Sequence, residues 1–475
     1  MKAILFGLLM MIVAGSSVMA QTDLPEVLGV VNGVKITKQD LSPETQSRIA
    51  ELQRSIDEAR ARELDLQIDS ILLEAEAKKR GVTPSQVIKD EVIAKVQAPT
   101  EAEAQAFYDQ NKAKLQVADF KTAKDDIIQF LHYQREQELA QKLSERFRTA
   151  AQVKVIAKPT APPATAADRA RVLAEVNGKQ ITMGDIENSL RPLIFNVQEE
   201  VYALRKQDLE LKINDTLLTQ EAQKRQVTTR ALLDAEVTPK VPQVTEAQAQ
   251  AFYNENKDRI SGDFAQTKPM IIQYMQEAKE REATRAFADQ LRRASKVEIN
   301  LSAPESPVFQ ISTDDQPSKG NPQARVTIIE FTDYQCPSCA QQYPVVERIM
   351  KEFGDRVRLV VRDFPLSQHA EALKAAEAAE AAREQGKYWE YVAVLFRNQS
   401  ALGVDKLKQY ATELGLDRAR FDSSLDSGKF ADKVQRDVLD GRKLGVNGTP
   451  TLYINGKRVS DRSYEALKAA IESSL

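Results

Sequence analysis

The sequence predicts three folded parts: two mainly α-helical repeats and then a C-terminal α/β domain with a helical insertion. Length is the first observation, because 475 residues at about 150 per domain correspond to about three domains. Composition is the second, since a chain rich in Ala, Glu, Gln and Lys with only 6% aromatic residues favours amphipathic helices. The third is a repeated motif in the first two thirds, after which strand and helix patterns alternate.

Charge and cysteine content exclude several classes of protein. The 66 Lys and Arg residues nearly balance 69 Asp and Glu residues, and a net charge of −3 does not fit a nucleic-acid binder or a polybasic membrane binder. The chain has only two cysteines, Cys336 and Cys339, so a scaffold stapled by many disulfides is excluded.

Residues 1–20 are predicted to be a signal peptide. Lys2 supplies a positive start, and the apolar run over residues 3–15 is too short to span a bilayer comfortably. Small residues before Ala20 then fit a cleavage site, with an uncleaved anchor as the alternative. Because no long apolar run follows, we expect a soluble periplasmic protein, in a compartment where disulfide chemistry is permitted.

An internal repeat occupies most of the first two thirds of the chain. Residues 31–37 recur as residues 176–182, and over the 81 positions that start at Asn32, 33 are identical to the residue 145 positions later. This identity is far above that of unrelated sequences, so the sequence predicts a duplicated domain. The two copies are expected over residues 27–156 and 172–300.

Each copy is predicted to form its own hairpin, helices and closing strand. The hairpin is centred on Asn-Gly, a strong turn signal, and Thr37 and Thr182 are expected to cap the helices that follow. Thr100 and Thr245 are expected to open a later helix that carries a Phe-Tyr pair. The last helices are expected over residues 122–150 and 268–294, and the β-like ends at Val153–Val155 and Val297–Ile299.

Two Pro-rich stretches separate the three parts. Residues 157–171 and 301–319 are expected to be extended linkers, because proline-rich sequence is semi-rigid and open. Composition then changes, and helical sequence alternates with buried strands over residues 326–331, 356–361 and 451–454. This alternation predicts an α/β domain over residues 320–475.

The strongest chemical signal is Cys336-Pro337-Ser338-Cys339, directly after a predicted strand. If Pro337 opens a helix, the Cys336 sulfur lies at the helix N-terminus, where main-chain amides and the helix dipole stabilise a thiolate. Cys339 lies one turn later on the same face and can attack a mixed disulfide on Cys336. The spacing therefore predicts thiol–disulfide exchange.

Metal binding and a purely structural disulfide are the competing interpretations of this pair. A structural zinc ion needs four ligands, and the two histidines, His132 and His369, lie in different predicted domains. A disulfide that closes a four-residue loop would remove little entropy from the unfolded chain. We therefore predict neither a metal nor another cofactor.

Three motifs of the last domain match a known family. They are residues 330–339 (Glu-Phe-Thr-Asp-Tyr-Gln-Cys-Pro-Ser-Cys), 363–366 (Asp-Phe-Pro-Leu) and 448–452 (Gly-Thr-Pro-Thr-Leu). With them, residues 320–475 resemble the DsbA-like family of the thioredoxin fold. The resemblance implies a thioredoxin fold in which residues 367–444 form a helical insertion.

The DsbA-like resemblance also implies roles for single residues. Cys336 would be the attacking sulfur, Cys339 the resolving sulfur, and Pro450 a cis-proline that faces the pair. A cis bond before Pro450 would expose the backbone of Thr449 for strand-like pairing with a substrate. Glu330 would be the buried acid that assists proton transfer to and from Cys339, with a solvent-facing carboxylate at the strand end as the alternative.

One position departs from the strongly oxidising members of that family. They carry His between the cysteines, where this chain has Ser338. Losing an imidazole beside Cys336 leaves the thiolate less stabilised, which predicts a weaker oxidant and leaves the net direction of electron flow open. His369 receives no role from the sequence and is interpreted as a polar residue at a helix start.

The two repeats resemble a second family. The matching motifs are Val-Asn-Gly-x-x-Ile-Thr-x-x-Asp, a Leu-rich helix that ends at residues 79–83, and the Phe-Tyr-x-x-Asn-Lys run at residues 107–112. They are similar to the N-terminal chaperone domain of SurA-like periplasmic foldases of the parvulin type. The chain passes directly from the Phe-Tyr helix into residues 120–151, without an isomerase segment. The resemblance therefore implies polypeptide binding without proline isomerisation.

Three functions follow from these patterns. The first is a periplasmic protein thiol–disulfide oxidoreductase whose repeats bind unfolded polypeptide clients. The second is a holdase chaperone with a regulatory redox domain, and the third is a dimeric disulfide isomerase whose repeats serve for oligomerisation. The full set of Cys336, Cys339, Glu330 and Pro450 favours the first. Its expected partners are unfolded or cysteine-containing exported proteins and a membrane or soluble redox partner for recycling, but not nucleic acid.

Overall fold

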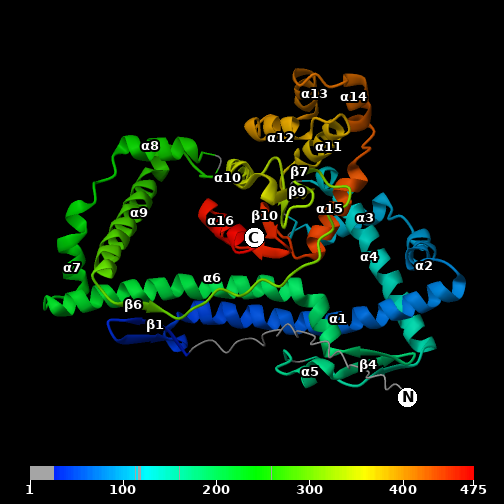
Figure 1. The fold of residues 1–475 in the computed structure, drawn as a ribbon, viewed down its shortest axis with the longest axis horizontal. Coiled ribbons are helices and arrows are strands. Elements are labelled where there is room, and N and C mark those ends of the chain that lie inside the picture. The colour runs from blue at the N-terminus through cyan, green and yellow to red at the C-terminus, as the bar shows by residue number, and fades with distance from the viewer. Residues whose placement is uncertain (1–25, 113, 116–118, 160, 258) are drawn as a thin grey trace, which may run out of the picture. The chain divides into compact units, whose positions relative to one another are not determined.

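The computed structural model describes residues 26–475 except residues 113, 116–118, 160 and 258. Its chain forms two compact units (Figure 1). One contains the described residues up to Leu190 together with Val201–Ser302, and the other contains Arg191–Glu200 together with Ala303–Leu475. The predicted signal peptide, residues 1–20, lies outside the described residues.

The two copies of the repeat have closely matching orders of elements. The first copy contains β1 (Val27–Val31), β2 (Val34–Thr37), η1 (Lys38–Asp40), α1 (Pro43–Arg80), α2 (Pro84–Glu91), η2 (Ile93–Lys95), α3 (Glu101–Asn111), α4 (Phe120–Ala150) and β3 (Val153–Val155). The second contains β4 (Val172–Val176), β5 (Lys179–Thr182), α6 (Met183–Lys224), α7 (Thr229–Glu236), η3 (Thr238–Lys240), α8 (Glu246–Glu255), α9 (Phe264–Arg293) and β6 (Val297–Ile299).

The longest helices of the unit, α1 and α6, start differently. Thr182 caps α6 directly and forms a capping box with Asp185. Thr37 forms the same box with Asp40, but there it opens only the short η1 helix. The long helix α1 starts later, after Ser42, whose hydroxyl accepts a hydrogen bond from the Thr45 amide. Pro43 at the first helical position explains the later start, because its fixed φ suits a helix N-terminus.

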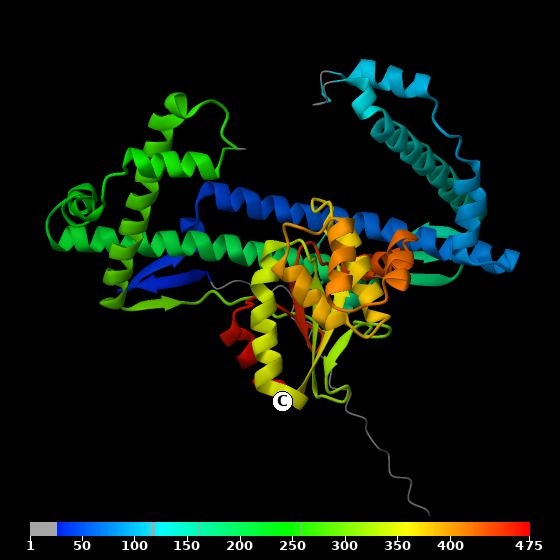
Figure 2. The ribbon, with the colours of Figure 1, turned by 90° about the horizontal axis from the view of Figure 1, so that it is seen from above.

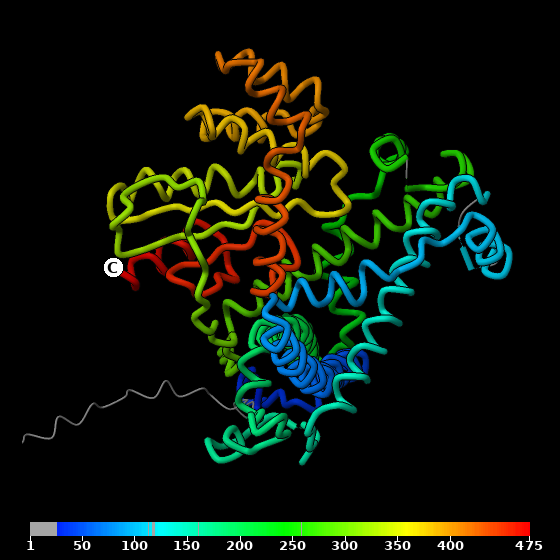
Figure 3. The backbone as a smooth tube through the Cα atoms, turned by 90° about the vertical axis from the view of Figure 1, so that its right-hand side faces the viewer, coloured from blue at the N-terminus to red at the C-terminus, as the bar shows by residue number. Residues whose placement is uncertain are grey.

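Helices α1 and α6 run side by side in opposite directions (Figures 1 and 2), and Figure 3 looks nearly along the pair. The start of α1 lies beside the second half of α6, where the Ser42 amide donates to the Asp208 carboxylate at 2.6 Å. Further along, the buried Arg60 pairs with Glu187 near the start of α6 at 2.6 Å. These contacts join the two copies into one unit.

The two copies exchange their N-terminal hairpins. Hairpin β1–β2 of the first copy pairs with β6, the last strand of the second copy. Hairpin β4–β5 of the second copy pairs with β3, the last strand of the first copy. Each three-stranded sheet is therefore built from both copies.

The apolar cores follow the same exchange. Leu28 and Val31 of the first hairpin pack on α6, in a cluster with Leu209, Ile213 and Leu217. In the equivalent cluster, residues of the second hairpin pack on α1 against its apolar stripe: Leu173, Val176 and Ile181 against Leu64, Ile68 and Leu72. The expectation that each copy would use its own hairpin is therefore wrong, because each hairpin buries its apolar face on the helix of the other copy.

The stretch between the copies is also more ordered than an extended linker. Within residues 157–171 a short helix, α5 (Ala166–Ala170), is capped by a box between Thr165 and Asp168. The prolines of the stretch precede this helix, so they do not interrupt it.

The second unit contains a five-stranded sheet in the order β11-β10-β8-β9-β7. Its strands are β7 (Ser318–Gly320), β8 (Val326–Thr332), β9 (Val357–Asp363), β10 (Thr451–Ile454) and β11 (Lys457–Val459). The central strands β8 and β9 are parallel, and the other pairs are antiparallel. Strands β8, β9 and β10 are buried almost throughout, which accounts for their many apolar residues.

Helices surround this sheet and fill the connection between β9 and β10. Helix α10 (Pro337–Phe353) links β8 to β9 through η4 (Gly354–Arg356), and α16 (Tyr464–Glu472) ends the chain. The insertion consists of α11 (Ala372–Arg383), α12 (Tyr388–Arg397), α13 (Val404–Glu413), α14 (Arg418–Asp426) and α15 (Ala431–Lys443). The largest apolar cluster of the unit combines the sheet with these helices.

The predicted linker 301–319 is largely part of this unit, so the domain starts before residue 320. Phe309 is buried against Tyr453, with their ring centroids 5.9 Å apart. The edge strand β7 pairs with β9, and the Val361 amide donates to the Pro317 carbonyl at 3.0 Å. The prolines do not prevent this packing, because an edge segment tolerates missing amide donors. Among the described residues, no helix has both the length and the apolar character needed to cross a membrane.

Candidate active site

Cys336 lies at the N-cap of α10, between β8 and the first helical turn. Pro337 occupies the first turn, where its missing amide costs nothing. The Cys339 and Ala340 amides donate to the Cys336 carbonyl at 3.0 and 3.2 Å, which closes the first turn. The Cys336 side chain faces the 448–450 loop, and its Sγ lies 3.4 Å from the Thr449 carbonyl oxygen.

Cys339 lies one turn into α10 and is completely buried. Burial raises the pKa of its thiol to about 12, and the nearby charge of Glu330 acts in the same direction. The Thr449 and Thr332 hydroxyls oppose this rise in pKa. Cys339 is thus held as a neutral thiol until a proton acceptor is available. Both cysteines are in the free, unbridged state.

Glu330 lies on the central strand β8, and only 6% of its surface is exposed. Burial raises the pKa of its carboxyl from 4.5 to about 7, while the Thr332 hydroxyl and the charge of Arg462 partly oppose this change. A carboxyl with a pKa of about 7 exchanges its proton readily at neutral pH. The structure places this group in the electrostatic environment of Cys339, and not at a solvent-facing strand end.

The loop before β10 completes the site. The Thr449–Pro450 peptide bond is cis, the geometry that the DsbA-like resemblance implies. Arg462 donates a hydrogen bond to the Pro450 carbonyl, and the Thr451 hydroxyl donates to the Gly448 carbonyl at 2.7 Å. All five residues proposed from the sequence, Cys336, Cys339, Glu330, Thr449 and Pro450, therefore belong to one connected region of the unit.

Asp333 and His369 were not assigned a role from the sequence, yet they shape the active-site loop. The Asp333 carboxylate is fully buried and accepts hydrogen bonds from the Gln335 amide at 2.7 Å and the Leu366 amide at 2.9 Å. His369 Nδ1 lies 2.7 Å from the same carboxylate, and 19% of the His369 side chain is exposed. The pair joins the loop before Cys336 to the segment after β9.

Two glutamines make further bonds to the same loop. The Gln335 side chain accepts a hydrogen bond from the Glu371 amide at 2.8 Å. Gln399, just after α12, donates to the Tyr334 carbonyl at 3.0 Å and to the Cys336 carbonyl at 2.8 Å. No local pattern indicated these contacts, because the partners lie more than thirty positions apart along the chain.

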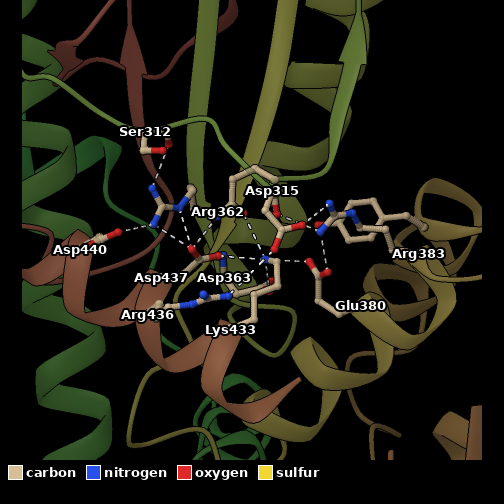
Figure 4. Close-up of polar contacts among 12 residues, drawn as sticks. Ser312, Asp315, Arg362, Asp363, Glu380, Arg383, Lys433, Arg436, Asp437 and Asp440 are labelled. Atoms are coloured by element: carbon tan, nitrogen blue, oxygen red, sulfur yellow. Dashed lines mark hydrogen bonds and ion pairs between the residues drawn. The ribbon is translucent and has the colours of Figure 1, made fainter. Parts of the chain in front are cut away.

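A buried ionic cluster lies where the insertion meets the sheet (Figure 4). Arg362 on β9 pairs with Asp437 on α15 at 2.8 Å. Lys433 on α15 lies 2.9 Å from Glu380 on α11 and 3.2 Å from Asp437. Asp363 is nearby, 3.9 Å from Lys433. Burial and the charge of Glu380 raise the pKa of the Asp363 carboxyl well above its usual range.

The ionic cluster connects to the active-site loop and to the segment that precedes the sheet. The Tyr334 hydroxyl donates to Asp363 at 3.3 Å and lies 2.7 Å from the Tyr388 hydroxyl. On the other side, Arg362 donates to the Ser312 carbonyl at 3.0 Å. The arrangement anchors the insertion beside the cysteine pair. Among the described residues, no three His, Cys, Asp or Glu side chains converge as metal ligands.

A comparison with protein families agrees with the fold of the C-terminal part of the chain. The family model Thioredoxin_4, described as thioredoxin, matches residues 312–473. The C-terminal part of the chain is therefore a thioredoxin-like domain, and the repeats lie outside the match. Among solved structures, BdbD from Bacillus subtilis is 27% identical and covers 36% of this chain and 98% of its own, with a TM-score of 0.34. A thioredoxin-like oxidoreductase from Silicibacter pomeroyi DSS-3 is 29% identical and covers 34% and 92%, with a TM-score of 0.32.

Curated relatives share only part of the chain. The Na(+)/H(+) antiporter NhaA 1 of Mycolicibacterium gilvum is 37% identical over 143 residues, which are 30% of this chain and 23% of the relative. The antiporter NhaA of Herminiimonas arsenicoxydans is 37% identical over 158 residues, 33% of this chain and 25% of the relative. The chain thus spans about a quarter of the length of these relatives.

Proposed function

We propose that the thioredoxin-like domain catalyses thiol–disulfide exchange on exported proteins. The observation that carries this proposal is the position of Cys336 at the N-terminus of α10, with its sulfur 3.4 Å from the Thr449 carbonyl oxygen. A sulfur at a helix N-terminus is stabilised as a thiolate by the free amides and the helix dipole. Beside it lie a buried second thiol and a carboxyl with a pKa of about 7.

The proposed exchange proceeds in two steps. In the reductive direction, the Cys336 thiolate attacks a client disulfide, a mixed disulfide forms, and one client thiolate leaves. Glu330, in its ionised form, accepts the proton of Cys339, directly or through an intervening group. The Cys339 thiolate then attacks Cys336 and releases the second client thiolate. Two electrons pass to the client, and the Cys336–Cys339 disulfide forms. Oxidation of a client is the exact reverse of these steps.

Ser338 between the cysteines favours a moderate oxidant over a strong one, since no imidazole is present to stabilise the Cys336 thiolate. We further propose that the chain is exported to the periplasm through residues 1–20 and that a separate redox partner recycles the pair. The measured reduction potential would assign the direction: about −120 mV is the value of DsbA, an oxidase, and roughly −270 mV is that of thioredoxin, a reductase.

Replacing the resolving thiol tests the proposal. A Cys339→Ala variant of the full chain should accumulate mixed disulfides through Cys336, because the second step is blocked. Covalent adducts with exported proteins should appear on non-reducing gels and disappear on reduction. The control is a Cys336→Ala/Cys339→Ala variant, which should form none. Absence of adducts with Cys339→Ala, or equal adducts with the double variant, would reject the assignment.

We also propose that the repeats bind unfolded polypeptide near the redox site. In the first copy, α3 and α4 bring Phe107 and Phe130 together, with ring centroids 5.3 Å apart. At the equivalent place in the second copy, α8 and α9 bring Phe252 and Tyr274 together, with ring centroids 5.7 Å apart. Phe130 is 45% exposed and Tyr274 is 55% exposed. Partly exposed aromatic rings suit contact with apolar client segments. This placement, together with the SurA-like resemblance, supports client binding.

Client binding is tested with the full chain and two substrates. A Phe130→Ala/Tyr274→Ala variant should reduce a small disulfide as fast as the wild type, because the cysteine pair is unchanged. It should act more slowly on a large unfolded client, since binding raises the local client concentration. The matched control is Leu66→Ala/Leu211→Ala, another exposed pair at equivalent positions, 62% and 61% exposed. Equal client rates for the aromatic variant and the wild type would remove the binding role.

The two alternative functions give different results. A holdase with a regulatory redox domain should suppress client aggregation without catalytic turnover of disulfides. A dimeric isomerase should have twice the chain mass in solution, and a monomer would exclude it.

A further inference from the structure

Gln399 is one of the side chains by which the helical insertion contacts the catalytic loop. Gln399 follows α12, and its amide nitrogen donates to the main-chain carbonyls of Tyr334 and Cys336, at 3.0 and 2.8 Å. A side-chain amide has two N–H donors, so both of them are used here on one short segment. The bonds cross more than sixty positions of sequence, and they join the insertion to the residue that carries the attacking sulfur.

The Cys336 carbonyl is also the first acceptor of α10. It accepts from the Cys339 and Ala340 amides, which set the direction of the first turn. A third donor, Gln399, therefore fixes the orientation of a peptide group on which the position of both sulfurs depends. If the Tyr334–Gln335 and Cys336–Pro337 peptide groups rotated, their carbonyl oxygens, which carry negative partial charge, would be free to approach the sulfur.

Asp333 holds the other side of the same segment. Its buried carboxylate accepts from the Gln335 amide, and its own carbonyl accepts from the Cys336 amide at 3.1 Å. Asp333 thus orders the amides of the loop, while Gln399 orders the carbonyls. Together these bonds hold the segment from both sides and keep the Tyr334 and Cys336 carbonyls turned toward Gln399.

We propose that Gln399 is a positioning residue that stabilises the reduced Cys336 thiolate and thereby sets the redox equilibrium of the Cys336–Cys339 pair. Its amide holds two carbonyl dipoles in place and offsets their negative ends with its own positive end. The proposal rests on the proposed exchange function. It makes the helical insertion an element that influences the redox equilibrium of the cysteine pair.

The test is the redox equilibrium of full-length Gln399→Ala in glutathione buffers. Loss of the amide should destabilise the reduced form, so the fraction of reduced protein at a given buffer ratio should fall. We expect about a tenfold change in the equilibrium constant, which is about 30 mV toward a more negative potential for a two-electron couple. The rate of attack on a small disulfide should fall as well.

Two further variants separate positioning from general stability. Gln399→Glu keeps the size but replaces the donor with a carboxylate facing two carbonyls, so its shift should be at least as large as that of Gln399→Ala. Gln385→Ala is the matched control, because Gln385 also joins two parts of the insertion, through the Asp417 amide and carbonyl, without touching the catalytic loop. This control should leave the equilibrium constant unchanged.

The outcomes distinguish this proposal from the proposed function. A wild-type chain that does not equilibrate with glutathione would refute the exchange function itself. An active wild type with an unchanged equilibrium constant in both Gln399 variants would overturn only the role of Gln399. An equal shift in Gln385→Ala would also overturn it, because the effect would then come from loosening of the insertion.

Discussion

Glu330 couples the chemistry of the site to the stability of the domain. Its carboxyl is buried on a central strand, and its pKa is about 7 in the folded protein against an ordinary value of 4.5. Between these two pH values the folded state keeps a proton that the unfolded state has already released. The contribution of this group to the free energy of unfolding therefore falls as pH rises from about 4.5 to about 7. Above that range the full penalty of burying an ionised carboxylate is present.

Replacing Glu330 should remove this penalty. Glu330→Gln should be more stable than the wild type at pH 8 by about 3 kcal/mol, because the pKa is raised from 4.5 to about 7 and each pH unit corresponds to about 1.4 kcal/mol. At pH 4 the two proteins should be nearly equal in stability. Urea unfolding followed by the fluorescence of Trp389 would measure this difference, because the chain has one tryptophan and it lies in the second unit. Exchange at neutral pH should be slower, since Cys339 loses its proton acceptor. A variant that is equally stabilised at pH 4 and pH 8 would contradict the explanation.

His369 offers a second prediction at the level of single residues. His369→Ala should destabilise the second unit by about 1–3 kcal/mol, because the buried Asp333 carboxylate loses one of its partners. The other histidine, His132, is the matched control: its side chain is 42% exposed, and it lies 3.4 Å from Glu136, one helical turn later. His132→Ala should change stability by less than about 0.5 kcal/mol. Trp389 fluorescence follows the second unit in His369→Ala, and circular dichroism follows the first unit, which contains His132. Similar effects of both variants would argue against the Asp333 contact.

How far the site could be predicted depends on the distance between its residues along the chain. The cysteine pair, Pro337 and Glu330 fall within ten positions, and so strand, turn and helix periodicity place them together. Asp333 and Gln399 could not be assigned in this way, because Asp333 bonds to the segment after β9, and Gln399 follows α12 but bonds to the loop before α10. Such contacts depend on how the insertion folds back, which local patterns do not encode.

At the level of elements, the hairpin exchange predicts that a core substitution acts at a distance. Leu28→Ala in β1 should open a cavity against α6 and cost about 2–5 kcal/mol. Amide hydrogen exchange should then speed up around Leu209 and β6, and much less around Leu64 on α1. The equivalent variant, Leu173→Ala in β4, should show the mirror image, with faster exchange around Leu64 and β3.

The opposite pattern of amide hydrogen exchange would contradict the exchange of hairpins between the copies. If Leu28→Ala loosened α1 and β3, each hairpin would be packed on its own copy.

The exchange of hairpins between the two copies could not be deduced from the sequence, for a specific reason. Leu209, Ile213 and Leu217 on α6 stand at the positions of Leu64, Ile68 and Leu72 on α1. Either hairpin therefore finds the same apolar stripe on either helix, and pattern alone does not distinguish self-packing from exchange. The element order and most helix boundaries, by contrast, follow from caps and periodicity that each copy carries.

For the whole molecule, the position at which the second unit begins has a measurable consequence for stability. A fragment over residues 303–475 should be more stable than one over residues 320–475, because only the longer one keeps Phe309 on Tyr453 and the bond from Arg362 to the Ser312 carbonyl. We expect a difference of about 3 kcal/mol or more from the loss of a buried aromatic side chain alone. Urea unfolding of both fragments, followed by Trp389 fluorescence, checks this. Equal unfolding midpoints would show that the segment before residue 320 is only a linker.

The exchanged hairpins also delay the completion of the sheet β2-β1-β6 while the chain is being synthesised. Hairpin β1–β2 leaves the ribosome first, but its partner strand β6 is the last element of the second copy and ends at Ile299. At about 5–20 residues per second, roughly 260 residues take some tens of seconds to make. Leu28, Val31 and Ile36 lack the α6 surface that buries them until Leu217 has been made, and β1 lacks its partner strand β6 for the whole interval. A newly made chain of this kind therefore depends, while it waits, on whatever protects exposed apolar strands.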